Sequence, residues 1–202
     1  SVLVTALTTI GQVLSCSLVA YGFARFNFKG KNVLFLLFLA TMMIPFQVIM
    51  VPLYLEVYYL KWLNTYWGLI IPKVASAYWI FLCRAAFQEL PKELEDAARI
   101  DGLGEFGIFW KIMLPLVKPT MITMLLLGIN NCWNDLLWPL IVANASTMRT
   151  LSNGLAIFIG DRTSEYSLAF TAAAVSMLPM LILYIFGQKY FVAGQVSSGI
   201  KG

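Results

Sequence analysis

One stretch of this sequence, residues 89–119, is charged, while the sequence on both sides of it is almost continuously apolar. It reads ELPKELEDAARIDGLGEFGIFWKIMLPLVKP and contains six of the ten acidic residues and four of the fourteen basic ones. Ionised side chains in this number are too costly to place in the hydrocarbon of a membrane. The stretch is therefore expected to be a water-exposed loop between membrane-embedded segments, and its simplest interpretation is a solvated connection.

The apolar sequence around this loop predicts five membrane-spanning helices, because each run is close to the roughly 20 residues that cross a bilayer. The runs are residues 2–23, 33–54, 66–87, 119–142 and 167–191. Hydrophobic residues make up 60% of the chain and charged residues only 12%, which is typical of an all-α, polytopic helical membrane protein. Pro45 and Pro52 are expected to kink or interrupt the second run, and Pro179 the fifth.

The charged loop predicts two short helices joined by a glycine. The first is expected from Pro91 to Asp101, because proline suits a first helical position and acidic residues suit the first turn. Glu95 and Arg99 are expected to form an i,i+4 ion pair on it. Gly102 then lies where a helix ends in the left-handed conformation, which other residues adopt at greater cost. A second helix follows and is expected to end at a proline, residue 115.

The spacing Asp96-Ala97-Ala98, Gly102 and Ile112-Met113-Leu114-Pro115 resembles the EAA loop of permease subunits of ATP-binding-cassette (ABC) importers. Asp96 stands where that motif usually has glutamate. The segments PKELEDAARIDG and WPLIV are similar, more narrowly, to the carbohydrate-uptake branch, the maltose-type inner-membrane permeases. This resemblance extends over essentially the whole chain. It implies a single transmembrane domain over residues 1–202, with type I ABC importer permease architecture. The family normally has six spans, so the chain is expected to be a fragment that lacks the first helix.

The resemblance also implies partners and a coupling site. Residues 89–118 would form a cytoplasmic coupling loop that docks into a groove on an ABC ATPase, and the ATPase pair, not this chain, would use ATP and Mg. The other expected partners are a second permease, identical or different, an extracytoplasmic solute-binding protein and the lipid bilayer. The residues expected to couple to the ATPase are Leu94, Asp96, Ala97, Ala98, Asp101, Gly102, Ile112, Leu114 and Pro115.

Nothing in the sequence predicts an enzyme. Histidine is absent, so no Ser/His/Asp or Cys/His arrangement can form. The three cysteines, Cys16, Cys83 and Cys132, are scattered through apolar runs without metal-site spacing and are expected to be small core residues. The net charge of +4 is modest, and membrane orientation explains it better than nucleic-acid binding does. We therefore expect no bound cofactor, no metal and no nucleic acid.

The basic residues predict an orientation in a bacterial plasma (inner) membrane. With five spans, ten of them lie on the side of the charged loop and three on the other side, with Lys73 expected to reach the interface near those three. The positive-inside rule then makes the loop cytoplasmic, with the N-terminus of the chain outside and its C-terminus inside. Residues 143–166 are expected outside, with a short amphipathic helix that contains Leu151, Leu155, Phe158 and Ile159.

A second candidate site is a polar patch on the fourth run: Asn131, Asn134 and Asp135, with Trp138 as an apolar platform for a sugar. The alternative is that these residues bond to neighbouring helices or lie at the outer interface. The function expected overall is a permease subunit of an ATP-driven sugar or oligosaccharide importer. The alternatives are an importer of another small solute, such as a sugar phosphate or an amino acid, and a non-transport membrane protein that uses the loop for docking.

Overall fold

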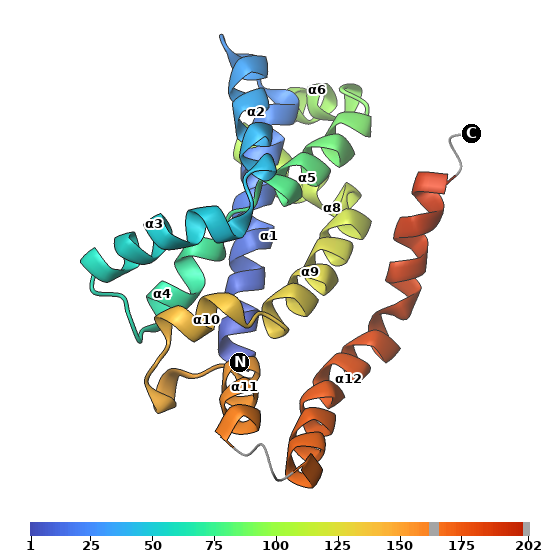
Figure 1. The fold of residues 1–202 in the computed structure, drawn as a ribbon. Coiled ribbons are helices and arrows are strands. Elements are labelled where there is room, and N and C mark those ends of the chain that lie inside the picture. The colour runs from blue at the N-terminus through green and yellow to red at the C-terminus, as the bar shows by residue number, and fades with distance from the viewer. Residues whose placement is uncertain (162–165, 200–202) are drawn as a thin grey trace.

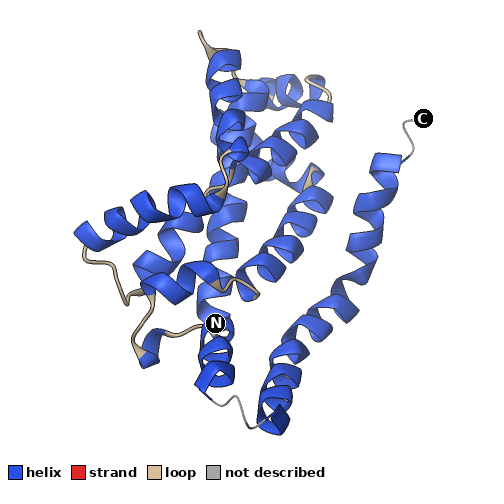
Figure 2. Ribbon diagram, viewed as in Figure 1, coloured by secondary structure: helices blue, strands red, loops and turns tan. Residues whose placement is uncertain are grey.

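The computed structural model describes residues 1–161 and 166–199, and within these ranges every regular element is helical (Figures 1 and 2). The all-α prediction is therefore confirmed. Three helices form the centre of the molecule: α1 (Val2–Arg25), α5 (Ala77–Glu89) and α9 (Lys118–Trp133). Each of the three packs against the other two. The charged loop and the remaining helices are arranged around this centre.

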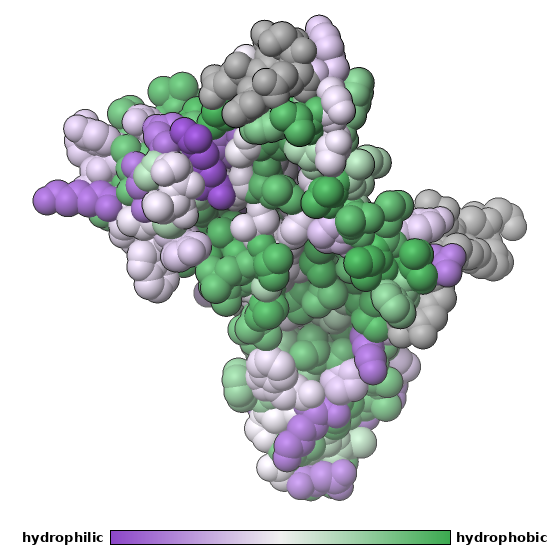
Figure 3. All heavy atoms as spheres, turned by 90° about the horizontal axis from the view of Figure 1, so that it is seen from below, coloured by the Kyte–Doolittle hydropathy of each residue, from purple (hydrophilic) through white to green (hydrophobic). Residues whose placement is uncertain are grey.

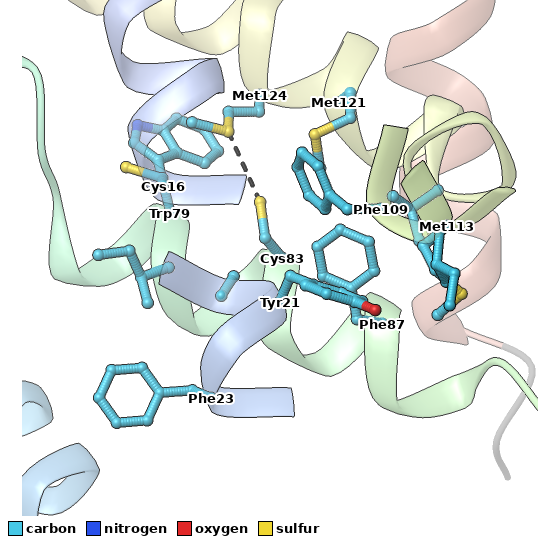
Figure 4. Close-up of a cluster of buried hydrophobic side chains, with 14 of the residues drawn as sticks. Cys16, Tyr21, Phe23, Trp79, Cys83, Phe87, Phe109, Met113, Met121 and Met124 are labelled. Carbon is cyan, nitrogen blue, oxygen red and sulfur yellow. Dashed lines mark hydrogen bonds between the residues drawn. The ribbon is translucent and has the colours of Figure 1, made fainter. Parts of the chain in front are cut away.

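Close packing in this centre depends on small side chains along α1. A Cβ atom added to Gly128 of α9 would lie only 3.0 Å from Cγ2 of Thr9, and one added to Gly11 would lie 2.9 Å from Cγ1 of Val74. Toward the loop end the core becomes aromatic and sulfur-rich (Figure 4). There the Cys83 thiol lies 3.7 Å from the sulfur of Met124. Cys16 and Cys83 are buried core residues, as predicted, and Cys132 is half-buried.

The second apolar run does not form one straight helix. It consists of α2 (Lys31–Ala40) with the 3₁₀ turn η1 (Thr41–Met43), followed by α3 (Phe46–Tyr59). The two halves meet at an angle of 101°. Pro45 lies at this break. The helix is interrupted there because proline has no N–H to continue the helical hydrogen bonds. Pro52 lies inside α3 and does not interrupt it.

The third and fourth runs are broken as well. The third comprises α4 (Tyr66–Ile70) with η2 (Ile71–Lys73), bent by 44° from α5. The predicted span over 119–142 is wrong in extent, because α9 ends at Trp133 and α10 (Leu137–Val142) is a separate short helix. The bent pair that contains α9 instead begins in the charged loop, as Glu105–Leu116 with Lys118–Trp133 at 77°.

Among the residues that the structure describes, two single helices are long and apolar enough to cross a membrane, Val2–Arg25 and Tyr166–Gln188. Five spans are reached when each of the three bent pairs is counted as one span. The predicted α11 (Leu151–Asp161) is present, and α12 (Tyr166–Gly199) follows as one helix that includes Pro179. Figure 1 shows α11 at the opposite end of the molecule from α6 (Glu93–Ile100). Seen from below, hydrophobic side chains cover most of the centre of the molecule and hydrophilic ones gather in a few clusters (Figure 3).

Candidate functional site

The first half of the charged loop is the helix α6, which has Glu93, Glu95 and Asp96 in its first turn. Its end confirms the prediction for Gly102, whose φ of +82° is left-handed. Two backbone hydrogen bonds close this end: the N–H of Gly102 donates to the carbonyl of Arg99, and the N–H of Leu103 to that of Ala98, both at 3.0 Å. The helix begins at Glu93, two residues later than the predicted Pro91, and residue 92 is its N-cap.

The two faces of α6 differ in burial. Ala98 is 2% exposed and packs into the chain's own core, so it is not available to an ATPase groove as the sequence suggested. The outward face carries Leu94, Ala97 and, 86% exposed, Ile100. Asp96 and Asp101 are exposed beside this face. Sequence reasoning missed Ile100, because the coupling residues came from the EAA resemblance, and this resemblance does not tell which face of the helix points outward.

The predicted pair between Glu95 and Arg99 does not form. Glu95 is buried and lies against Arg25 of α1, with 3.4 Å between Oε1 and Nε. Arg99 instead pairs with Asp96 at 2.8 Å and with Glu105 at 2.9 Å, both in exposed positions. The reason is the inward direction of Glu95, which lies on the same face of α6 as Ala98 and so points away from solvent.

The second half of the loop comprises α7 (Glu105–Ile108), the π-helical segment η3 (Phe109–Met113) and α8 (Leu114–Leu116). Pro115 lies inside α8, and the helix continues one residue beyond it. Ile112 and Leu114 are half-buried and pack against the central core, so both attach the loop to this core. Pro115 is exposed.

The second candidate site is a polar cavity of about 420 Å³ between α1, α3, α5 and α9. Asn131 and Asp135 both line it, as part of the predicted patch. Asp135 forms an ion pair with Lys73, through Oδ2 and Nζ. Lys73 was expected to reach the membrane interface; the structure places its ammonium group at this cavity instead. The amide of Gln12 donates a 2.7 Å hydrogen bond to the Lys73 carbonyl.

The other two predicted pathway residues lie elsewhere. Asn134 lines a different cavity, of about 480 Å³ between the end of α9, α11 and α12, and donates to the carbonyl of Asn130 at 2.9 Å. Trp138 is fully buried, and its indole N–H donates to the Gly68 carbonyl at 2.9 Å. It is therefore a core residue and cannot be a sugar platform, because a ligand cannot reach its ring. For a tryptophan inside a short apolar run, the sequence does not distinguish a buried core position from a position that faces a cavity.

Broken apolar helices around a cavity, with a folded charged loop at one end, are typical of a membrane transport subunit. Within the described part of the chain, no three His, Cys, Asp or Glu residues are placed to share a metal ion. The family model described as "binding-protein-dependent transport system inner membrane component" matches residues 14–195. The chain belongs to this family.

Two relatives and one solved structure refine the comparison. The arabinooligosaccharides transport system permease protein AraQ of Halalkalibacterium halodurans is 41% identical over 202 residues, which cover all of this chain and 72% of that protein. The sn-glycerol-3-phosphate transport system permease protein UgpE of Yersinia enterocolitica is 33% identical, covering 94% of this chain and 68% of that protein. The crystal structure of a bacterial ABC transporter that imports the acidic polysaccharide alginate matches with a TM-score of 0.84 and 25% identity, covering 94% of this chain and 72% of that one.

Proposed function

We propose that this chain is a permease subunit of an ATP-driven importer of a sugar or short oligosaccharide. The observation that carries the proposal is the 41% identity, along the entire chain, to a permease named for arabinooligosaccharide transport. As in the family, the chain would work with a second permease, an ATPase pair and an extracytoplasmic binding protein. ATP and Mg would be used by the ATPase pair.

The polar cavity supports this substrate class. Sugars present many neutral hydroxyl groups, which amide side chains such as Asn131 and Gln12 can both donate to and accept from. The cavity also holds a cation, Lys73, which would attract a phosphorylated solute of the kind named for UgpE. However, Lys73 is already paired with Asp135, so the cavity offers no uncompensated positive charge to a phosphate. This favours neutral sugars over sugar phosphates.

The coupling loop is proposed to dock through the outward face of α6. Leu94, Ala97 and Ile100 form an apolar surface that the chain itself leaves uncovered. Asp96 and Asp101 beside it supply negative charge for a basic groove. The distribution of basic residues supports a cytoplasmic location for this end of the molecule, where a partner ATPase would act.

The test is solute uptake by intact cells in which the chromosomal gene is deleted, with and without a plasmid that carries the gene. We expect plasmid-dependent uptake of radiolabelled arabinooligosaccharides or of a related short oligosaccharide. Labelled sn-glycerol 3-phosphate serves as the competing substrate, and uptake of this compound alone would replace the sugar assignment with that of a sugar-phosphate importer. Uptake of neither class, with the complex intact in the membrane, would refute both assignments.

A further inference from the structure

Arg25, the last residue of α1, holds two parts of the charged loop at once. Its side chain is 4% exposed, and its Nη2 donates a 2.7 Å hydrogen bond to the carbonyl of Leu90, where α5 ends. Its Nε faces Glu95 of α6, whose side chain is 5% exposed. A single guanidinium therefore contacts both the chain entering α6, through a hydrogen bond, and α6 itself, through an ion pair at 3.4 Å that is not a hydrogen bond.

A second tie lies one turn earlier on α1. The hydroxyl of Tyr21 donates to Oε2 of Glu105 at 3.5 Å, at the start of the second loop helix. The Tyr21 ring lies 5.6 Å from that of Phe87 on α5 and 5.2 Å from that of Phe109 in the loop. Figure 4 shows these three rings side by side. The end of α1 thus contacts both halves of the loop, on either side of Gly102.

The burial of the pair between Arg25 and Glu95 distinguishes it from the other ion pairs of the loop. Arg99 pairs with Asp96 and Glu105 while 42% of its side chain is exposed, and water screens such pairs. A buried pair carries a desolvation penalty that packed apolar side chains would avoid, so it adds little to stability. In some proteins, a buried pair instead fixes one defined geometry between two elements.

The same helix also lines the polar cavity, through Thr8 and Gln12. Gln12 and Arg25 are 13 residues apart on one uninterrupted helix, which corresponds to about 20 Å along its axis. A displacement of α6 that is rigidly transferred to Arg25 would therefore move the wall of the cavity.

We propose that Arg25 and Glu95 are positioning residues that join the coupling helix rigidly to α1 and so transmit its movement to the polar cavity. This inference rests on the proposed docking of α6 to an ATPase. The two residues touch neither substrate nor nucleotide in this scheme. Their function is to make α6 and α1 move as one body.

The experiment uses the complete complex, purified with its ATPase and reconstituted in liposomes with the binding protein and the transported sugar. The variants are Arg25→Gln, Glu95→Gln and the charge reversal Arg25→Glu/Glu95→Arg. Lys111→Gln is the matched control, because Lys111 is an exposed basic residue of the same loop outside the joint. Three quantities are measured for each variant: ATPase copurified, ATP hydrolysed and sugar transported.

We expect both single variants to retain the ATPase, since the outward face of α6 is unchanged. Sugar transported per ATP should fall below the wild-type ratio, because ATP hydrolysis would continue while α6 moves without α1. The charge reversal should recover most of this ratio, and Lys111→Gln should match the wild type. Amide hydrogen exchange in residues 93–100 should be faster in the single variants, because α6 loses its attachment.

Single variants that transport as much sugar per ATP as the wild type would overturn the inference. If the single variants fail to fold, the double variant Arg25→Met/Glu95→Leu is used for the same measurements, because its side chains fill the space without buried charge. A folded apolar pair with normal coupling would show that packing alone is sufficient and would also overturn the inference. Failure of the wild-type chain to copurify an ATPase would instead refute the proposed function.

Discussion

Lys73 and Asp135 are tolerated at the polar cavity because each neutralises the other. Only 22% and 20% of their side chains are exposed, so removal of either partner leaves a charge largely away from water. For a fully buried pair this costs about 3–5 kcal/mol, and the partial exposure here reduces the cost. The pair connects η2 to the end of α9, which lie 62 residues apart in sequence.

Lys73→Met should therefore lower the thermal unfolding midpoint of the purified chain, and Lys73→Met/Asp135→Leu should recover it. Neither variant should recover sugar uptake, because both change the polarity of the cavity. Differential scanning fluorimetry in detergent and uptake by cells are the two measurements. A double variant as unstable as the single one would show that the ion pair does not explain the effect.

Gly102→Val tests the left-handed turn at the end of α6. A β-branched residue at φ +82° is strained by about 1–3 kcal/mol, although a Cβ atom there meets no neighbour within 4 Å. We expect normal membrane insertion and reduced copurification of the ATPase. Gly104→Ala is the control, because Gly104 has φ −74° and equally open surroundings. Equal ATPase binding by both variants would remove the conformational reason for this glycine.

At the scale of elements, the two faces of α6 predict opposite failures. Ile100→Asp alters an 86% exposed side chain, so it should leave stability unchanged and abolish association with the ATPase. Ala98→Leu adds volume inside the core and should destabilise the fold by about 1–3 kcal/mol. Copurification and thermal unfolding of both variants separate the two effects. If only Ala98→Leu lost the ATPase, with an unchanged unfolding midpoint, the inner face of α6 would be the docking face and our assignment would be wrong.

Local features of the loop could be predicted from the sequence, while its attachment could not. The turn at Gly102 depends on a few neighbouring residues, and the positions of the helices follow from charge and proline. The partner of Glu95 is 70 residues away, and a nearer cation, Arg99, offered an equally acceptable local pairing. The resemblance assigned Ala98 to the docking surface, but sequence alone does not tell which face of a short helix meets the bundle.

At the scale of the whole molecule, most apolar runs were located correctly and Pro45 marked one break, but the size of that bend and the breaks of the third and fourth runs were not predicted. The hydropathy of a segment indicates that it avoids water, but it does not distinguish a straight span from a broken one. Pro45 marked a kink, yet the angle of 101° comes from contacts of α2 with α5 and of α3 with α10. The polar cavity was missed in part for the same reason, since Lys73 and Gln12 reach it only through the packing of separate helices.

The orientation of the molecule is testable with single cysteines in a background without native ones. Thr147→Cys, exposed in η4 (Ser146–Met148), should react with an impermeant maleimide in intact cells. Asn27→Cys, exposed at the turn between α1 and α2, should react only after permeabilisation. The reverse labelling pattern would place α6 outside the cell and would refute docking to an ATPase.

The bend between α2 and α3 also constrains the order of events during biosynthesis. Residues 33–54 leave the ribosome as one uncharged run of about 33 Å when helical, which is long enough to enter the bilayer as a straight segment. In the folded molecule α3 packs instead on α10, which is synthesised much later. The second segment is therefore synthesised well before α10, and we expect it to reach its final shape only after α10 has been inserted.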